Sequence, residues 1–332
     1  MAPEIAEPVL LTGAGFTHNF GGYLASTMWA HIFNSPAIQS RPGLAALLRQ
    51  DLDYESAYRE ILYGNYAAEE KTAFTQAVAA VYEQLDSVLC NILGPPARGF
   101  PDIYQLSRFI NRFAGQGNLR GYFFTLNQDL FVERWYQGEQ IPITPGVPNL
   151  RVAPQAMRAL TGDDLRTLPD ADETGRARQE DEAPVGESGC FHYVKLHGSS
   201  NWRTHDGRNA MVIGGRKPEQ IAGEPILEWY FDLFRQVLAL PGRRLLVIGY
   251  GFGDEHLNQV LGEAVERLAL KWYVLAPEDP RQFVDKVHRG GAGERIWDGL
   301  AGYFPYTLSD LFPVGEGRET EPARQVRRAI FG

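Results

Sequence analysis

The chain has 332 residues, of which 44% are hydrophobic and 22% are charged, as is usual for a globular protein that buries a sizeable core. Its 32 Lys and Arg residues against 41 Asp and Glu residues give a formal net charge of −9. Such a charge repels a phosphate backbone, so direct binding of nucleic acid is not expected. Cys90 and Cys190 are too few for a four-thiolate zinc site. No metal is therefore expected, and both cysteines are interpreted as buried thiols.

Membrane association and secretion are also not expected. No stretch of the sequence approaches the ~18 uninterrupted apolar residues of a membrane helix. The N-terminal sequence MAPEIAEPVLLTG lacks a basic region followed by an apolar stretch and a cleavage site. These features predict a cytoplasmic protein.

Five short apolar runs, at 9–11, 121–125, 191–196, 244–248 and 272–275, predict strands buried on both faces of a parallel sheet. Small and polar residues follow each run, such as TGAG at 12–15 and GYGFGD at 249–254. In open α/β sheets, ligands bind at the carboxyl ends of the strands, where the strand order reverses. The pattern therefore predicts a Rossmann-like α/β fold with helices on both faces of the sheet and a ligand site at that edge.

Apolar residues at helical spacing in 44–62, 67–93 and 102–113 predict a helical insertion between the first two strands, about 35–115. This insertion either covers the ligand site or forms a plain supporting layer. Residues 161–189 are highly charged and predict a polar loop. We expect a single domain over 1–312 and a polar, then basic, tail over 313–332, which is either disordered or docked on a partner subunit.

Four segments carry candidate chemistry. GAGFT at 13–17 suits a close approach to a pyrophosphate, although His18 replaces the third glycine of the dinucleotide fingerprint and a tight structural turn explains the glycines equally well. Asn127 and Asp129 offer polar groups just past a strand, but both are also common turn formers. His197 suits general-base work or a structural role. The glycines at 249–253 offer bare backbone, and an aromatic ring there is expected to lie on a base, unless the segment is only a mobile loop.

Together these residues resemble the sirtuin superfamily, and more closely its prokaryotic SIR2-like NAD-degrading domains. GAGFT is similar to the sirtuin GAG-x-S turn, with Thr17 in place of serine, and TLNQD at 125–129 is similar to the T-Q-N-I-D motif. LHG at 196–198 resembles the motif of the catalytic histidine, and GYGF at 249–252 lies where the family has its adenosine-ribose loop. The order and spacing of the motifs agree over roughly residues 8–280.

Two departures from the deacylase pattern matter. The I-P-D-F-R stretch of sirtuin deacylases is absent after the glycine turn, where FGGYL follows at 20–24. Two distant cysteines cannot supply the four-cysteine zinc module of the acyl-lysine tunnel. The helical insertion and the absent zinc module both resemble SIR2-like proteins of bacterial anti-phage defence.

The resemblance implies hydrolysis of NAD+ to nicotinamide and ADP-ribose. By this resemblance, Asn127 holds the ribose hydroxyls or the attacking water, and Asp129 holds the nicotinamide carboxamide. His197 orients the ribose or removes a proton from the water. The implied cofactor-binding residues are Gly13, Ala14, Gly15, Phe16, Thr17, Thr125, Gly198, Ser199, Gly249, Tyr250, Gly251 and Phe252.

The resemblance also implies NAD+ depletion as an abortive-infection response. Control by a homo-oligomer or by a HerA-type ATPase partner is then expected. Two alternatives stay open: a protein deacylase or ADP-ribosyltransferase that uses the same cofactor, and a non-enzymatic sensor of NAD or ADP-ribose.

Overall fold

The computed structural model describes residues 5–92, 99–114, 120–136, 141–144, 158–159, 190–204, 209–315 and 317–332. The expected polar loop at 161–189 lies outside these residues. The strands of the described part are β1 (Ile5–Thr12), β2 (Arg120–Thr125), β3 (Ile141–Ile143), β4 (Arg158–Ala159), β5 (Cys190–Lys195), β6 (Gly198–Arg203), β7 (Asn209–Met211), β8 (Arg244–Ile248), β9 (Lys271–Leu275) and β10 (Leu300–Phe304).

The helices of the first half of the chain are α1 (Ala14–His18), α2 (Ala25–Phe33), α3 (Pro36–Gln39), α4 (Pro42–Gln50), α5 (Tyr54–Tyr63), α6 (Ala68–Cys90), α7 (Ile103–Asn111), the short η1 (Arg112–Ala114) and α8 (Phe131–Trp135). Those of the second half are α10 (Lys217–Ala222), α11 (Pro225–Leu238), α12 (Glu255–Leu268), α13 (Pro280–Val287), α14 (Gly293–Asp298), α15 (Leu308–Leu311) and α16 (Glu321–Phe331).

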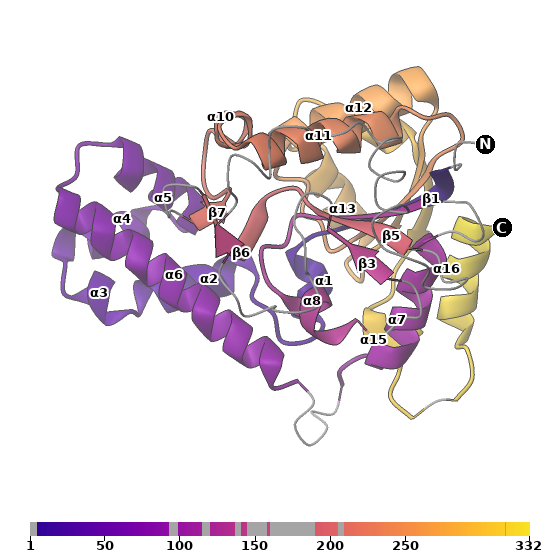
Figure 1. Cartoon of the computed structure of the whole chain (residues 1–332), viewed down its shortest axis with the longest axis horizontal. Coiled ribbons are helices and arrows are strands. Elements are labelled where there is room, and N and C mark those ends of the chain that lie inside the picture. Colours follow the sequence, from indigo (N-terminus) through magenta and orange to yellow (C-terminus); the bar gives the residue numbers. More distant parts are fainter. Residues whose placement is uncertain are drawn as a thin grey trace.

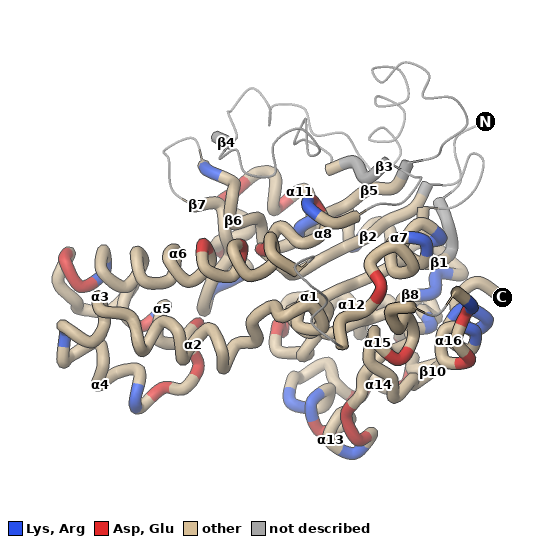
Figure 2. Tube along the Cα trace, turned by 90° about the horizontal axis from the view of Figure 1, so that it is seen from below, with Lys and Arg blue, Asp and Glu red and all other residues tan. Residues whose placement is uncertain are grey.

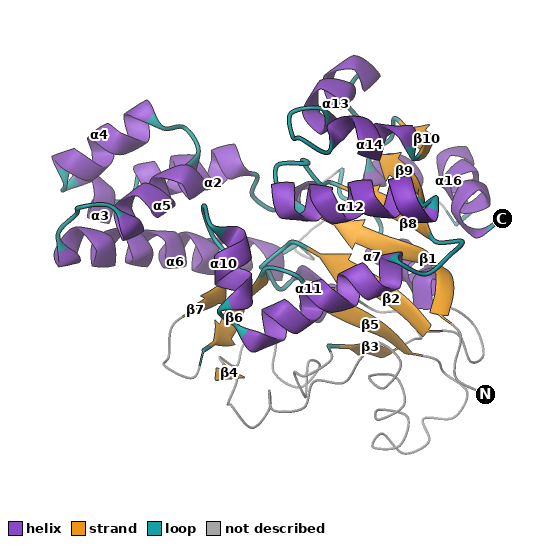
Figure 3. Cartoon of the chain, turned by 90° about the horizontal axis from the view of Figure 1, so that it is seen from above, coloured by secondary structure: helices purple, strands orange, loops and turns teal. Residues whose placement is uncertain are grey.

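Seven of the described strands form a parallel sheet in the order β10-β9-β8-β1-β2-β5-β3, and all five predicted strands belong to it. Along β1, Val9 and Leu11 face one hydrophobic cluster and Leu10 faces the other, as strand geometry requires. The first cluster includes α11, α12 and α14, and the second includes α7, α8, α15 and α16. Figure 3 shows α11 and α12 lying over one face of the sheet. The predicted Rossmann-like α/β fold is thereby confirmed.

Between β1 and β2, helices α2–α6 form a unit, here called the helical group, with its own core that includes Leu48 and Phe74. It extends beyond one end of the sheet (Figure 1). The helical insertion is confirmed, but its helices begin at residue 25 rather than about 35, and α7 packs against the sheet instead of within the group. The expected helix at 44–62 is divided because Asp53 caps α5, its carboxylate accepting a hydrogen bond from the Glu55 amide at 3.1 Å.

The expectation of a disordered tail is wrong, whereas docking of the tail on a partner subunit stays a prediction. Residues 321–331 form α16, whose Val326 and Ile330 are fully buried in the sheet's own core. Thr320 caps the helix by accepting a hydrogen bond from the Ala323 amide at 3.2 Å. Charged residues of both signs occur along α16, as they do along α13 (Figure 2). The helix is amphipathic, so its apolar stripe packs on the body of its own chain.

Candidate functional site

Four strands of the sheet end at one level. Thr12 is paired with Thr125 on one side and with Ile248 on the other, and Thr125 is paired with Lys195. The segments that follow β1, β2, β5 and β8 therefore leave the sheet side by side. The chain passes from β1 to β2 and only later to β8, on the other side of β1, so the strand order reverses between β1 and β8. This is the position at which α/β sheets bind ligands.

The glycine turn after β1 packs directly on the loop after β8. The amide of Gly13 donates to the carbonyl oxygen of Ile248, and the amide of Gly15 donates to that of Gly249, both at 3.0 Å. A Cβ atom on Gly13 or Gly15 would lie 2.7 Å from Gly249 backbone atoms. The close approach of two turns thus accounts for these glycines, which is the structural alternative stated for them.

Ala14 and Gly251 are exposed, and a Cβ on Gly251 would meet no heavy atom within 4 Å. The aromatic side chains of the second loop behave differently from the expectation. The rings of Tyr250 and Phe252 are 6% and 2% exposed and pack on each other in the core. Neither ring is therefore free to lie on a base, and only the backbone of this loop remains for a nucleotide.

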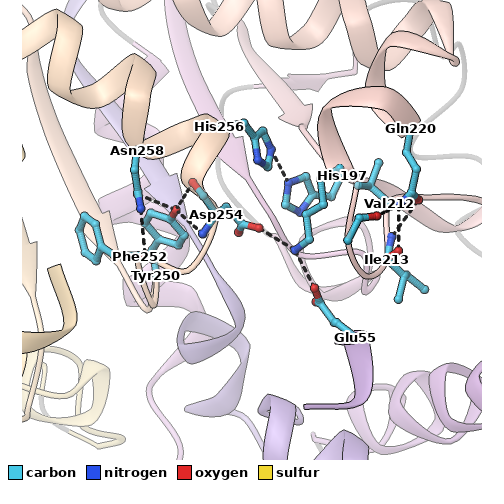
Figure 4. A network of polar contacts seen from close by, with 12 residues as sticks. Glu55, His197, Val212, Ile213, Gln220, Tyr250, Phe252, Asp254, His256 and Asn258 are labelled. Carbon is cyan, nitrogen blue, oxygen red and sulfur yellow. Dashed lines mark hydrogen bonds and ion pairs between the residues drawn. The ribbon is translucent and has the colours of Figure 1, made fainter. Parts of the chain in front are cut away.

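The loop after β8 is held by hydrogen bonds to α12. The Tyr250 hydroxyl donates to Asn258 Oδ1 at 2.9 Å, and the Asn258 side-chain amide donates to the Phe252 carbonyl at 2.8 Å (Figure 4). Phe252 has φ of +54°, an uncommon left-handed conformation for a bulky residue. The bond from Asn258 and the aromatic packing hold that conformation in place.

Three further candidates for cofactor binding have roles inside the protein. Gly198 has φ of +74°, and a Cβ there would lie 1.9 Å from the Ala210 carbonyl oxygen, so glycine is needed for β6 to pair with β7. Ser199 is fully buried, and its hydroxyl donates to Asn201 at 2.8 Å. The ring of Phe16 is buried against Phe123 and its neighbours. The side chains of Ser199 and Phe16 are therefore occupied by protein contacts.

Polar side chains gather between the first two strand ends. The Thr12 hydroxyl donates to that of Thr125 at 2.8 Å, and the Asn127 side-chain amide donates to the Thr17 hydroxyl at 3.4 Å. Asp129 accepts the Phe131 amide at 3.0 Å, which confirms a turn-forming role for this residue. Burial raises the pKa of Asp129 to about 6, despite the opposing charge of Lys195.

Gln128, which the sequence analysis overlooked, connects the two candidate catalytic segments. Its side-chain amide donates to the carbonyl oxygens of His197 at 3.2 Å and Val212 at 2.7 Å. Its side-chain oxygen accepts the Tyr82 hydroxyl from α6. The structure thus places Asn127 and His197 on the same edge of the sheet, with the helical group in contact with that edge.

His197 lies next to a second histidine, His256, which the sequence analysis did not single out. Their Nε2 atoms are 3.4 Å apart (Figure 4). His197 is 4% exposed, and burial lowers its pKa to about 3 against the opposing charge of Asp254. Burial likewise lowers the pKa of His256 to about 4. Both imidazoles are therefore neutral at pH 7. By contrast, His192 is buried within β5 beside Tyr122 and packs as expected.

A network of ion pairs adjoins this histidine pair. Lys217 at the start of α10 contacts Asp254 at 2.6 Å and Glu55 of the helical group at 2.7 Å. Burial would raise the pKa of Asp254, but attraction to neighbouring positive charge, including Lys217, lowers it below its usual range. Lys217 therefore links the loop after β8 to the helical group; Figure 4 labels its two partners, Asp254 and Glu55.

A second buried ion pair lies beneath Asp129. Lys195 is fully buried at the end of β5, and its ammonium donates to the Asp129 carbonyl oxygen at 2.5 Å and to Glu133 at 2.7 Å. The signal available in the sequence was a lysine inside an otherwise apolar and aromatic run, FHYVKL. Buried lysines are rare without a partner, so Lys195 and Glu133 fix the position of the Asp129 turn.

The described residues contain neither a candidate metal site nor a candidate membrane-spanning helix. Within the ranges given above, no group of three or more His, Cys, Asp and Glu side chains could hold a metal ion. In the same part of the chain, every helix is too short or too polar to cross a bilayer.

A family model for the SIR2-like domain matches residues 121–290, a little over half of the chain. The matched range contains Asn127, His197 and the loop at 249–254, whereas the glycine turn at 13–17 precedes it. A search of curated proteins found no match. SIR2-like domains use NAD+, and the parallel sheet found here is consistent with their fold. The chain belongs to the SIR2-like domain family.

Proposed function

We propose that this protein hydrolyses NAD+ at the bond between nicotinamide and ribose, releasing nicotinamide and ADP-ribose. The observation that supports the proposal is that Asn127 and His197 follow neighbouring strands at one edge of the sheet, where Gln128, the residue after Asn127, donates a hydrogen bond to the His197 carbonyl oxygen. The exposed residues Ala14 and Gly251 follow β1 and β8, the two strands of the switch point. Backbone without large side chains suits the diphosphate and adenosine ribose.

The reaction requires little covalent chemistry from the protein. When the C1′–N bond breaks, its electron pair moves to the positively charged nicotinamide ring, and positive charge develops on the ribose, as in other glycosyl transfers. A water oxygen then bonds to C1′ and loses one proton. Asn127 holds ribose hydroxyls or this water, and His197, which is neutral at pH 7, orients the ribose or accepts the proton as it is released. Asp129, ionised at neutral pH, favours the developing cation and holds the nicotinamide carboxamide.

The assay is incubation of the purified protein with NAD+, with nicotinamide and ADP-ribose measured by chromatography. We expect Asn127→Ala and His197→Ala to lower turnover by about 10²-fold or more while the proteins remain folded by circular dichroism. The matched control is His288→Ala, because His288 is exposed and its ring packs on Trp297. A His197→Ala variant with the wild-type rate would refute the role given to His197.

The same assay separates the two alternatives. Nicotinamide release that depends on an added acyl-lysine peptide would favour a deacylase or ADP-ribosyltransferase. Binding of ADP-ribose in calorimetry without any turnover of NAD+ would favour a sensor.

We further propose that NAD+ depletion serves anti-phage defence and is controlled by homo-oligomerisation or by a HerA-type ATPase. The resemblance of the motifs to SIR2-like defence proteins supports this part. Size-exclusion chromatography and NAD+ turnover, each with and without such a partner, test it. A lone monomer with full activity would count against control by assembly.

A further inference from the structure

The contact between His197 and His256 joins two parts of the chain that are 59 residues apart. His197 follows β5, and His256 lies in the first turn of α12. Their ring centroids are 5.5 Å apart and their planes are inclined by 30°. The atoms in contact are the two Nε2 nitrogens, at 3.4 Å. A neutral imidazole carries a proton on one nitrogen only, so one Nε2 donates and the other accepts.

The two rings differ in their access to water. His197 is 4% exposed, whereas His256 is only partly buried. A proton that reaches His197 from the substrate side therefore has a neighbouring nitrogen to move to, on a residue that is more exposed than His197. Since His197 is enclosed, this neighbour offers a short path for the proton to leave the site.

Charged groups from three other elements act on His256. Asp254, which precedes α12, favours the protonated form, while Lys217 of α10 and Arg235 of α11 oppose it. The ammonium of Lys217 is already engaged by Asp254 and Glu55. Burial is the largest influence on both imidazoles and lowers the pKa of each, while the carboxylate of Asp254 acts on both in the opposite direction and favours a proton during its transfer along the pair.

We propose that His256 is a positioning residue that sets the tautomer of His197 and relays the proton released by the attacking water from His197 to solvent. The proposal rests on the hydrolysis of NAD+ proposed above. In the balanced step, the C1′–N bond breaks and its electron pair goes to nicotinamide. The water oxygen forms the new C1′–O bond and gives its proton to the bare Nδ1 of His197. The Nε2 proton of His197 then passes to the bare Nε2 of His256, and the Nδ1 proton of His256 leaves to bulk water. One proton is released for each NAD+ cleaved.

The test replaces His256 by glutamine, which keeps a side-chain hydrogen-bond donor but cannot carry a proton in this pH range. We expect His256→Gln to lower kcat about tenfold or more, as loss of an assisted proton transfer does, with KM for NAD+ changed by less than about threefold. Added imidazole should restore part of kcat, because a small proton carrier can reach the partly exposed position. His288→Gln is the matched control and should keep both constants.

A second measurement does not depend on activity. Nitrogen-15 NMR of the histidine rings should find Nε2 of His197 protonated and Nε2 of His256 bare at pH 7; the opposite assignment would overturn the relay. The His197 signals should shift in His256→Gln and remain in place in His288→Gln.

The outcomes separate the relay from the proposed function. If the wild type cleaves NAD+ and His256→Gln matches it in kcat, or loses kcat in a way that imidazole does not restore, the relay is overturned and the hydrolase stands. If the wild type and every variant fail to cleave NAD+ both alone and with a HerA-type ATPase partner, the proposed function is overturned and the relay falls with it. Loss of kcat, rescue by imidazole and opposite tautomers together support the relay.

Discussion

Replacement of Gly249 by alanine tests the packing of the two turns at the switch point. Gly249 has φ of +70°, and an added Cβ would lie 2.2 Å from the Phe16 amide nitrogen and 2.6 Å from the Cα of Gly15. Left-handed backbone costs a residue with a side chain about 1–2 kcal/mol, and overpacking costs about 1–3 kcal/mol. We therefore expect Gly249→Ala to lower the free energy of unfolding by about 2–5 kcal/mol.

The matched control is Gly251→Ala, two residues further on. Its Cβ would meet nothing within 4 Å, and its φ is outside the left-handed region. Its effect on stability should stay within about 0.5 kcal/mol. Differential scanning calorimetry should find the midpoint of Gly249→Ala lower by about 4–10 °C, at about 2 °C for each kcal/mol. Equal midpoints for the two variants would refute the reasoning.

Three more predictions concern stability. Lys195→Met should lower the free energy of unfolding by about 3–5 kcal/mol, because the carboxylate of Glu133 is then buried without its cation. Adding Glu133→Leu should recover most of this loss, as measured by urea titration. If the losses of the two single variants simply add in the double variant, the reasoning is wrong. Because the folded pKa of Asp129 is about 6 and an unfolded Asp has about 3.9, the wild type should lose up to about 3 kcal/mol relative to Asp129→Asn as pH rises from about 4 to 7. Thermal midpoints at both pH values check this, and a constant difference would tell against it. Ile330→Ala should lower the free energy of unfolding by about 2–5 kcal/mol, because Ile330 is fully buried. Arg328→Ala, at an exposed position of the same helix, should lower it by about 0.5 kcal/mol or less. An unchanged thermal midpoint for Ile330→Ala would mean that α16 does not support the core of its own chain.

The five main strands and the polar segments after them could be predicted because their signals are local. An apolar run bounded by glycine and polar residues identifies a buried strand, and the parallel sheet then places the strand ends together. For the same reason Asn127 and His197 could be predicted to share one edge. Short edge strands such as β10 escaped prediction because LAGYF carries a weaker apolar signal than the central runs.

Other parts of the site depend on contacts between residues distant in the sequence. The sequence alone determined that an aromatic residue, Tyr250, and a histidine, His256, lie in and just after a glycine-rich loop. Only the packing of α12 against this loop buries the Tyr250 ring and brings His256 into contact with His197. The partners of Lys195 and the docking of α16 are likewise tertiary. Hydrophobic periodicity reports which side of an element is buried, whereas the identity of the buried neighbour is decided by how all the elements pack together.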